Sequence, residues 1–372
     1  MSPKTVSVAP PAINPHLTKL QPYPPGKPIE DVKREFGLDD VVKLASNENP
    51  LGPSPKALKA MADVATEMHL YPDGGAYYLR QALSKKLGVA ADELILGNGS
   101  DEITLLLMIA YAGPGRELIT SEYSFVRYRM EAELAGAPVK LVPMRDMKHD
   151  LRAIAAAVTR KTALICLDVP CNPTGSTVSK RELVRFLKAV PENVIVVLDQ
   201  AYYEYAAGLD DEYPDGIALR SARPNLVVTR TFSKAYGLAG LRLGYAVTRP
   251  EIAQDVDRVR PPFNANRMVQ AAGIAALNDA AHLRRSNETN RKGMAQLEKG
   301  FDKLGIRHWP SLANFILVDV KRDCREVFHE LLKLGVVTRP MAGYGLKTHL
   351  RISIGTREEN AKCLAAMKTV LK

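Results

Sequence analysis

Short runs of apolar, β-branched residues alternate with amphipathic segments through the middle of the chain. The four clearest runs lie at residues 94–96, 163–167, 194–198 and 226–229. Between two of them, the segment 179–189 places its apolar residues at helical spacing. Strands that alternate with helices are typical of a parallel sheet covered on both faces. The pattern therefore predicts an α/β fold with a large, mostly parallel sheet.

A change in composition near residues 258–262 indicates a domain edge. A long helical stretch, 265–304, follows it, and two further strand candidates lie at 315–318 and 350–354. The stretch before Leu44 is too short to fold alone, so we expect it to pack on the C-terminal unit. We predict a large domain at 47–260 and a smaller α+β domain built from both termini. Residues 1–46 would supply its arm, and 261–372 the linking helix and the rest.

Composition narrows the class of protein. The chain has 372 residues, 46% of them apolar and 25% charged, which excludes a disordered chain. No apolar run approaches the roughly 20 residues of a membrane span. Residues 1–20 have no apolar stretch of the kind found in secretory signals. Four cysteines occur without a C-x-x-C pair, and the histidines form no metal-binding motif. We therefore expect a cytoplasmic protein with reduced thiols, no resident metal and no membrane contact.

The net charge of +10 comes from 51 Lys and Arg against 41 Asp and Glu. The basic residues are dispersed and form no block of the kind that binds nucleic acid. A positive cleft concentrates small anions equally well. The charge therefore favours a small anionic ligand and no nucleic-acid partner.

The candidate chemistry lies where the predicted strands end, the place where open α/β sheets bind ligands. Residues 97–102 (Gly-Asn-Gly-Ser-Asp-Glu) follow the first strand and precede an apolar helix expected from Ile103. Glycines and free N–H groups at a helix start suit a phosphate group, although a plain capped turn has the same pattern. Glu102 stands where a dinucleotide fingerprint needs a small residue, which argues against a nicotinamide cofactor.

Three further strand ends carry polar residues. Asn172-Pro173-Thr174-Gly175 is a strong turn sequence, and Asp199 with Tyr202 follows the next strand. A carboxylate at a buried strand end needs a partner, such as a cationic ring nitrogen.

The last of these strand ends carries Lys234, between hydroxyl residues and a glycine-rich, largely apolar stretch. This placement suits an amine of lowered pKa that forms a Schiff base. Nearby Thr231, Ser233 and Arg242 offer donors for a phosphate. Together the strand ends predict pyridoxal 5'-phosphate as the cofactor.

These motifs carry a family resemblance that runs from Tyr23 to Thr356. Its markers are the sequences at 44–52, 71–73, 99–102, 172–175, 231–234 and 350–356. The chain resembles the fold-type I, aspartate aminotransferase-like pyridoxal-phosphate enzymes, and among them the histidinol-phosphate aminotransferases. The resemblance implies a seven-stranded, mostly parallel sheet covered by helices in the large domain.

The resemblance also implies roles at the cofactor. Lys234 would form the internal aldimine and move the substrate proton, and Asp199 would keep the pyridine nitrogen protonated. Asn172 and Tyr202 would bind the phenolic oxygen, and Tyr123 would stack on the ring. The phosphate ligands would be Ser100, Asp101, Thr231, Ser233 and Arg242, with Tyr71 reaching in from the other subunit of a homodimer.

For substrates, the resemblance implies transfer of an amino group from L-histidinol phosphate to 2-oxoglutarate in histidine biosynthesis, by a ping-pong cycle. Arg351 would bind the carboxylate of glutamate, and Arg339 and Tyr23 would bind the phosphate of the donor. An aromatic or broad-specificity aminotransferase, an amino-acid-phosphate decarboxylase and a non-catalytic cofactor-binding module are the alternatives.

The sequence departs from the family pattern in three places. Ser121-Glu122 stand where Pro-Thr is usual, Val126 where a second aromatic residue is expected, and Gln200 where glutamate is common.

Overall fold

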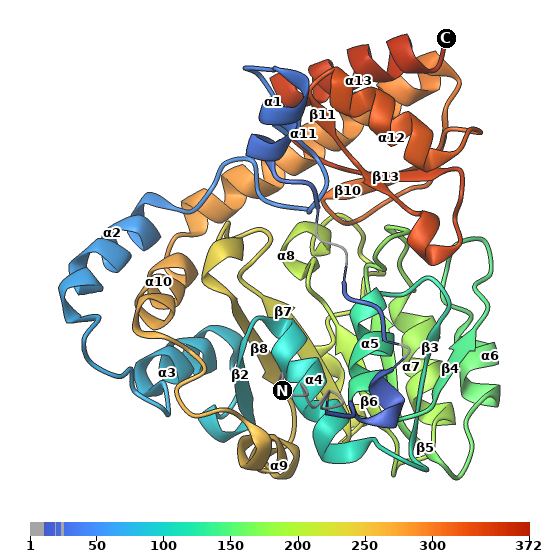
Figure 1. The fold of residues 1–372 in the computed structure, drawn as a ribbon. Coiled ribbons are helices and arrows are strands. Elements are labelled where there is room, and N and C mark those ends of the chain that lie inside the picture. Colours follow the sequence, from blue (N-terminus) through green and yellow to red (C-terminus); the bar gives the residue numbers. More distant parts are fainter. Residues whose placement is uncertain (1–10, 19, 24–25) are drawn as a thin grey trace, which may run out of the picture.

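A seven-stranded sheet forms the centre of the larger part of the molecule (Figure 1). The computed structural model describes residues 11–18, 20–23 and 26–372, so part of the predicted N-terminal arm lies outside the described residues. In sheet order the strands are β2 (Leu94–Asn98), β8 (Leu243–Val247), β7 (Leu226–Thr231), β6 (Ile195–Asp199), β5 (Thr162–Asp168), β3 (Glu117–Ser121) and β4 (Val139–Val142). The strand β8 alone runs in the direction opposite to the other six strands. The predicted mostly parallel sheet is confirmed.

Helices bury both faces of this sheet. Side chains alternate along β5, so that Ile165 and Leu167 join one apolar cluster while Leu164 and Cys166 join another. The first cluster includes residues of α6 (Leu151–Ala156) and α7 (Lys180–Ala189), and the second those of α4 (Ser100–Tyr111), α5 (Val126–Leu134) and α9 (Pro250–Val259). Near the β2 edge lie α2 (Pro55–Val64), α3 (Tyr77–Leu87) and α10 (Arg267–Leu277), and α8 (Tyr203–Ala206) follows β6. This double coverage explains why the central strands β5 and β6 are almost entirely apolar.

A four-stranded antiparallel sheet forms the smaller part. Its order is β12 (Arg339–Pro340), β13 (His349–Ser353), β10 (Phe315–Asp319) and β9 (Arg307–His308). Its helices are α1 (Ile29–Phe36), α11 (Ala280–Leu304), α12 (Cys324–Lys333) and α13 (Arg357–Val370). The strand β1 (Val42–Lys43) pairs in parallel with β11 (Val336–Val337), which brings the N-terminal stretch onto the C-terminal unit as expected. The exact domain boundaries stay a prediction.

Two sequence-based helix assignments need correction. The predicted helix 265–304 is two helices, α10 and α11, because the chain breaks at Asn278–Asp279. The side chain of Asp279 accepts a hydrogen bond from the N–H of His282 and so caps the start of α11. The helix α4 begins at Ser100, three residues before the expected start. Among the described residues, no helix is long and apolar enough to cross a membrane.

Candidate active site

A small cavity of about 130 Å³ opens at the carboxyl ends of β5, β6 and β7. It brings together nine of the predicted residues from five segments of the chain. They are Ser100, Asp101, Asn172, Asp199, Tyr202, Thr231, Ser233, Lys234 and Arg242. Phe125, Asp168, Pro170 and Ala201 complete its lining. The strand ends that looked separate in the sequence therefore form one pocket.

One wall of this cavity is a cradle for an anion. Gly99 has a φ of +80°, and the helix α4 that follows has no side-chain cap, so its first N–H groups are available. A Cβ on Gly244 would lie 2.3 Å from the backbone nitrogen of Ser100, so only glycine lets β8 approach this closely. Arg242 donates to Ser233 Oγ over 3.3 Å and lies 3.8 Å from Asp101 Oδ2. The residues present fit a phosphate group.

Asp199 lies at the opposite wall, buried and in register with Asp168 on β5. Tyr128 Oη donates to Asp199 Oδ2 over 2.7 Å, and the N–H of Ala201 donates to Oδ1 over 3.0 Å. Burial raises the pKa of Asp199 to about 6, against the opposing effect of the Tyr128 hydrogen bond. A cationic ring nitrogen at this carboxylate would favour its ionised form. Nothing in the sequence indicated the role of Tyr128, because its partner Asp199 lies 71 residues further along the chain.

Two amides position the side chains between these walls. Asn47 Nδ2 donates to the hydroxyl of Tyr202 over 2.9 Å, and Arg351 Nη1 donates to Asn172 Oδ1 over 2.5 Å. Because the oxygen of Asn172 is engaged, its Nδ2 is left to donate to a ligand. Asn47 also hydrogen-bonds Ser353 of β13, and so connects the small sheet to the pocket. Its role was not foreseen, since the sequence shows only an asparagine in a loop.

Lys234 extends into the pocket from the loop after β7. Its Nζ donates to the carbonyl of Ser46 over 3.3 Å. Burial, followed by the nearby charge of Arg351, lowers the pKa of Lys234 to about 8. A substantial fraction of the amine is therefore neutral near physiological pH, as a Schiff-base lysine requires. With the anion cradle and Asp199, this amine fits pyridoxal phosphate.

The predicted stacking residue Tyr123 does not line the cavity, whereas Phe125 does. Tyr123 instead packs against a cluster built on Leu317 and Met341. The ring centroids of Phe125 and Tyr128 lie 5.6 Å apart. Two aromatic residues near one turn are equivalent in sequence alone, and the structure places Phe125 rather than Tyr123 at the small cavity. Val126, where a second aromatic residue was expected, lines the larger cavity.

The other two departures serve local structure. Gln200 is buried, and its amide donates to the carbonyl of Pro214 over 2.7 Å and accepts from the N–H of Gly216 over 3.1 Å. Glu122 accepts a hydrogen bond from the N–H of Met144 over 2.9 Å. Neither side chain is among those lining the small cavity.

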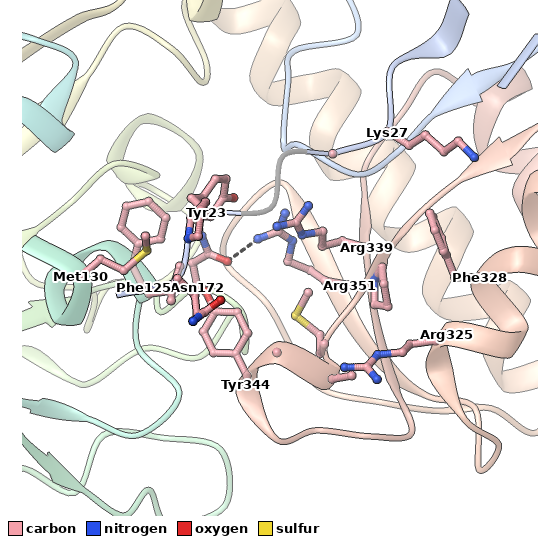
Figure 2. Close-up of a pocket in the computed structure, with 18 of the residues that line it drawn as sticks. Tyr23, Lys27, Phe125, Met130, Asn172, Arg325, Phe328, Arg339, Tyr344 and Arg351 are labelled. Atoms are coloured by element: carbon pink, nitrogen blue, oxygen red, sulfur yellow. Dashed lines mark hydrogen bonds between the residues drawn. The ribbon is translucent and has the colours of Figure 1, made fainter. Parts of the chain in front are cut away.

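A larger cavity of about 870 Å³ adjoins the first one, since Phe125 and Asn172 line both (Figure 2). Arg351 and Arg339 enter it from paired positions on β13 and β12. The guanidinium carbon of Arg339 lies 5.4 Å from the ring centre of Tyr23. Lys27, Arg129 and Arg325 add further cations to the lining, with Glu133 as its acidic residue. The three predicted substrate residues thus share one positively charged cavity.

Tyr71 lies apart from both cavities of this chain. Its side chain is 80% exposed, and its ring stacks on Phe263 with centroids 4.8 Å apart.

The family of the protein follows from comparison with known sequences. The model of the aminotransferase class I and II family matches residues 39–367. The chain therefore belongs to the class I and II aminotransferases, as its fold and pocket indicate.

Within that family, several histidinol-phosphate aminotransferases are similar to this chain over nearly their whole length. The one from Moorella thermoacetica is 48% identical over 95% of this chain and 92% of its own length. The one from Anaeromyxobacter sp. (strain Fw109-5) is 49% identical over 97% and 99%. The crystal structure of histidinol-phosphate aminotransferase from Sinorhizobium meliloti, in complex with pyridoxal-5'-phosphate, superimposes with a TM-score of 0.89. It is 30% identical and covers 98% of both chains. The predicted resemblance is confirmed.

Proposed function

We propose that the protein is a pyridoxal-phosphate-dependent aminotransferase that transfers the amino group of L-histidinol phosphate to 2-oxoglutarate, a step of histidine biosynthesis. The observation that carries this proposal is the pair of adjoining cavities. One holds a buried lysine, a buried aspartate and an anion cradle, and the other holds a group of cations. The names of the similar proteins support the same reaction.

When bound, pyridoxal phosphate supplies an aldehyde that condenses with amines and a protonated ring that accepts the electrons of a breaking bond. Lys234 would hold the aldehyde carbon through its amine and would move the proton of the substrate carbon. Asp199, whose carboxylate accepts a hydrogen bond from Tyr128, would hold the proton at the ring nitrogen. Asn172 and Tyr202 would donate to the phenolic oxygen, and Phe125, in place of Tyr123, would pack against the ring.

The phosphate of the cofactor is bound by groups of the anion cradle. They are the backbone N–H groups of Ser100 and Asp101 and the side chains of Thr231, Ser233 and Arg242. A helix N-terminus and a planar guanidinium both favour a dianionic phosphate.

The cations of the larger cavity discriminate between substrates. Arg351 binds a carboxylate of glutamate or 2-oxoglutarate through its planar fork. L-Histidinol phosphate has no carboxylate, so its phosphate is bound by Arg339 and Tyr23 instead. The two substrates then use one site in turn, which is a ping-pong cycle.

The proposal includes a homodimer in which Tyr71 reaches the cofactor phosphate of the partner subunit. Its support is a group of large apolar side chains exposed at the β2 edge of the molecule. They are Met68, Leu70, Tyr71, Tyr77, Tyr78 and Phe263. A cytoplasmic location is also proposed, because all four cysteines are free, buried thiols.

The visible spectrum of the cofactor-loaded protein tests the reaction. L-Histidinol phosphate, L-glutamate and L-phenylalanine are added separately while the long-wavelength band is followed. Bleaching by histidinol phosphate at the lowest concentration supports the proposal. Bleaching by phenylalanine at lower concentration would favour the aromatic aminotransferase, and a protein without a visible band would refute the cofactor assignment.

A further inference from the structure

A second buried carboxylate lies beside Asp199 and has no role in the reaction proposed above. Asp168 ends β5, is 3% exposed and lines the smaller cavity. Its Oδ2 accepts from the N–H of Asn172 over 2.6 Å and from the N–H of Phe125 over 3.2 Å. These two residues line both cavities and contact the ring in the proposed function. The carboxylate of Asp168 therefore ties together the backbones of Phe125 and Asn172, which are 47 residues apart in the sequence.

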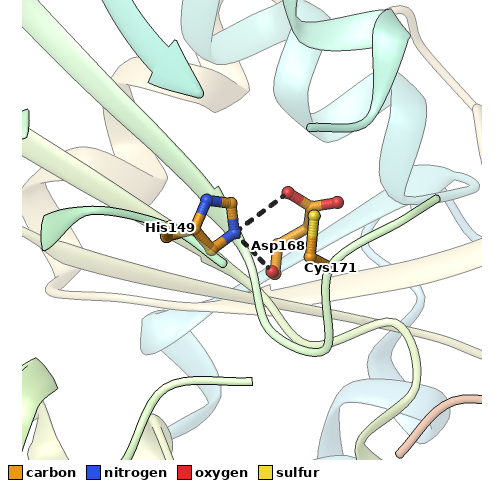
Figure 3. A group of neighbouring side chains, drawn as sticks. All are labelled: His149, Asp168 and Cys171. Atoms are coloured by element: carbon orange, nitrogen blue, oxygen red, sulfur yellow. Dashed lines mark hydrogen bonds and ion pairs between the residues drawn. The ribbon is translucent and has the colours of Figure 1, made fainter. Parts of the chain in front are cut away.

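The imidazole of His149 lies against this carboxylate (Figure 3). Its side chain is fully buried, with Nε2 2.9 Å from the carbonyl oxygen of Asp168 and 3.5 Å from Oδ1. Both groups are acceptors, so Nε2 carries a proton. Nδ1 lies 2.7 Å from Ser121 Oγ, which accepts when the ring is protonated. Asp168 Oδ1 has no hydrogen-bond partner and faces this imidazole.

The electrostatics agree with an ion pair. Burial disfavours a charged His149, but the neighbouring Cys171 and Asp168 outweigh it and raise the pKa of the imidazole well above its ordinary value. Burial raises the pKa of the Cys171 thiol, and the carboxylate of Asp168, 3.5 Å from Nε2, is the ion-pair partner that the geometry offers His149. Without a protonated His149, Asp168 would be a second negative charge beside Asp199. The proximity of Asp168 raises the pKa of Asp199.

We propose that Asp168 and His149 form a positioning pair for the cofactor: the carboxylate fixes Phe125 and Asn172 through their N–H groups, and the imidazolium cancels its charge. Asp199 then remains the single uncompensated carboxylate facing the ring nitrogen. The inference rests on the proposed function, since it concerns how the ring contacts are held.

A bound metal ion is the competing explanation of the same cluster. The ligand atoms of His149, Asp168 and Cys171 lie within 4.8 Å of one another. However, Nε2 already faces a carbonyl oxygen and Oδ2 already accepts two N–H groups. The one acceptor left over, Asp168 Oδ1, lies 3.5 Å from Nε2 and so faces the imidazole, which makes an ion pair the better interpretation.

The first experiment tests whether His149 compensates the charge of Asp168. It compares His149→Gln with the double variant His149→Gln/Asp168→Asn. In the loaded protein, the pH midpoint of the visible band is measured. The single variant leaves an unpaired anion near the ring, so its midpoint rises by on the order of one pH unit. The double variant removes that anion and returns the midpoint to the wild-type value. His282→Gln, a buried histidine that lines neither cavity, is the matched control and shifts nothing.

The second experiment tests whether Asp168 positions Phe125 and Asn172. It measures the affinity of the apoprotein for pyridoxal phosphate by fluorescence. Asp168→Ala removes the acceptor and weakens binding about tenfold, by the usual contribution of hydrogen bonds to a charged group. Asp168→Asn keeps an acceptor oxygen and retains most of the affinity. Thermal unfolding of each apoprotein checks that the variants fold, and the asparagine variant carries the test if the alanine variant does not.

Three results would overturn the inference. The first is a midpoint that moves equally in the single and double variants, which would indicate packing rather than charge. The second is wild-type affinity in Asp168→Ala. The third is one zinc ion per chain in the wild-type protein that His149→Gln loses, which would establish the metal site. A wild-type protein that shows no visible band would instead refute the proposed function itself.

Discussion

The hydrogen bond from Tyr128 to Asp199 offers the sharpest test of how the pocket holds a charged carboxylate. Both side chains are buried, and the bond is 2.7 Å long. A hydrogen bond to a charged group contributes about 1.5–3 kcal/mol. Because one pKa unit corresponds to about 1.4 kcal/mol, Tyr128→Phe should raise the pKa of Asp199 by about 1 to 2 units. The starting value in the wild-type protein is about 6.

The consequence depends on pH in a defined direction. With a pKa of about 6, roughly nine-tenths of Asp199 is ionised at pH 7. After a shift of about 1.5 units, roughly a quarter is ionised at pH 7, whereas near pH 9 both proteins are almost fully ionised. The affinity of the apoprotein for the cofactor should therefore fall about fourfold at pH 7 and recover at high pH, and kcat/KM should fall in the same direction.

The assay is cofactor affinity and kcat/KM measured from pH 6 to 9.5 in parallel. Tyr213→Phe is the matched control, because its buried hydroxyl donates to the neutral carbonyl of Val169 over 2.7 Å. That variant should lose the same factor at every pH. If Tyr128→Phe also loses activity uniformly across the range, the hydrogen bond does not act through the ionisation of Asp199.

Three further predictions concern single residues. Lys234→Ala should abolish transamination while thermal unfolding stays cooperative, since the side chain makes one long hydrogen bond; measurable turnover of this variant would contradict the role of the amine. Arg339→Ala should raise KM for L-histidinol phosphate about tenfold or more and leave KM for glutamate nearly unchanged, by the usual contribution of a hydrogen bond to a phosphate; equal changes for both substrates would contradict this assignment. Phe125→Leu should weaken cofactor binding about two- to tenfold, as expected for loss of a stacked ring, while Tyr123→Leu should not, and the reverse order would restore Tyr123 as the stacking residue.

Much of the site was accessible from the sequence because its residues follow buried strands. Runs of apolar residues identify β5, β6 and β7, and the residue after such a run lies at the edge where parallel strands open. Asn172, Asp199 and Lys234 could thus be singled out by position alone, and the structure brings all three to one pocket. The pattern of apolar residues was less informative about the strands away from the centre of the sheet. The strands β3, β4 and β8 were not predicted, because short or glycine-containing runs resemble loops.

Contacts between remote segments were decided by the tertiary structure. The sequence cannot distinguish Tyr123 from Phe125, since both follow β3 within five residues; only the packing of that turn turns one ring into the pocket and the other into the cluster with Leu317. Likewise, nothing local pairs Tyr128 with Asp199.

The sequence by itself determined the alternation of strands and helices around β5, β6 and β7 and the chemistry offered at their ends, because backbone periodicity and turn residues are local properties. The tertiary structure decided which of those groups meet and how far each is removed from water. Desolvation is a property of the whole packed molecule, and it is what lowers the pKa of Lys234 and raises that of Asp199. It also made visible the pairing of Asp168 with His149, two residues that lie 3.5 Å apart in space and on different elements of the chain.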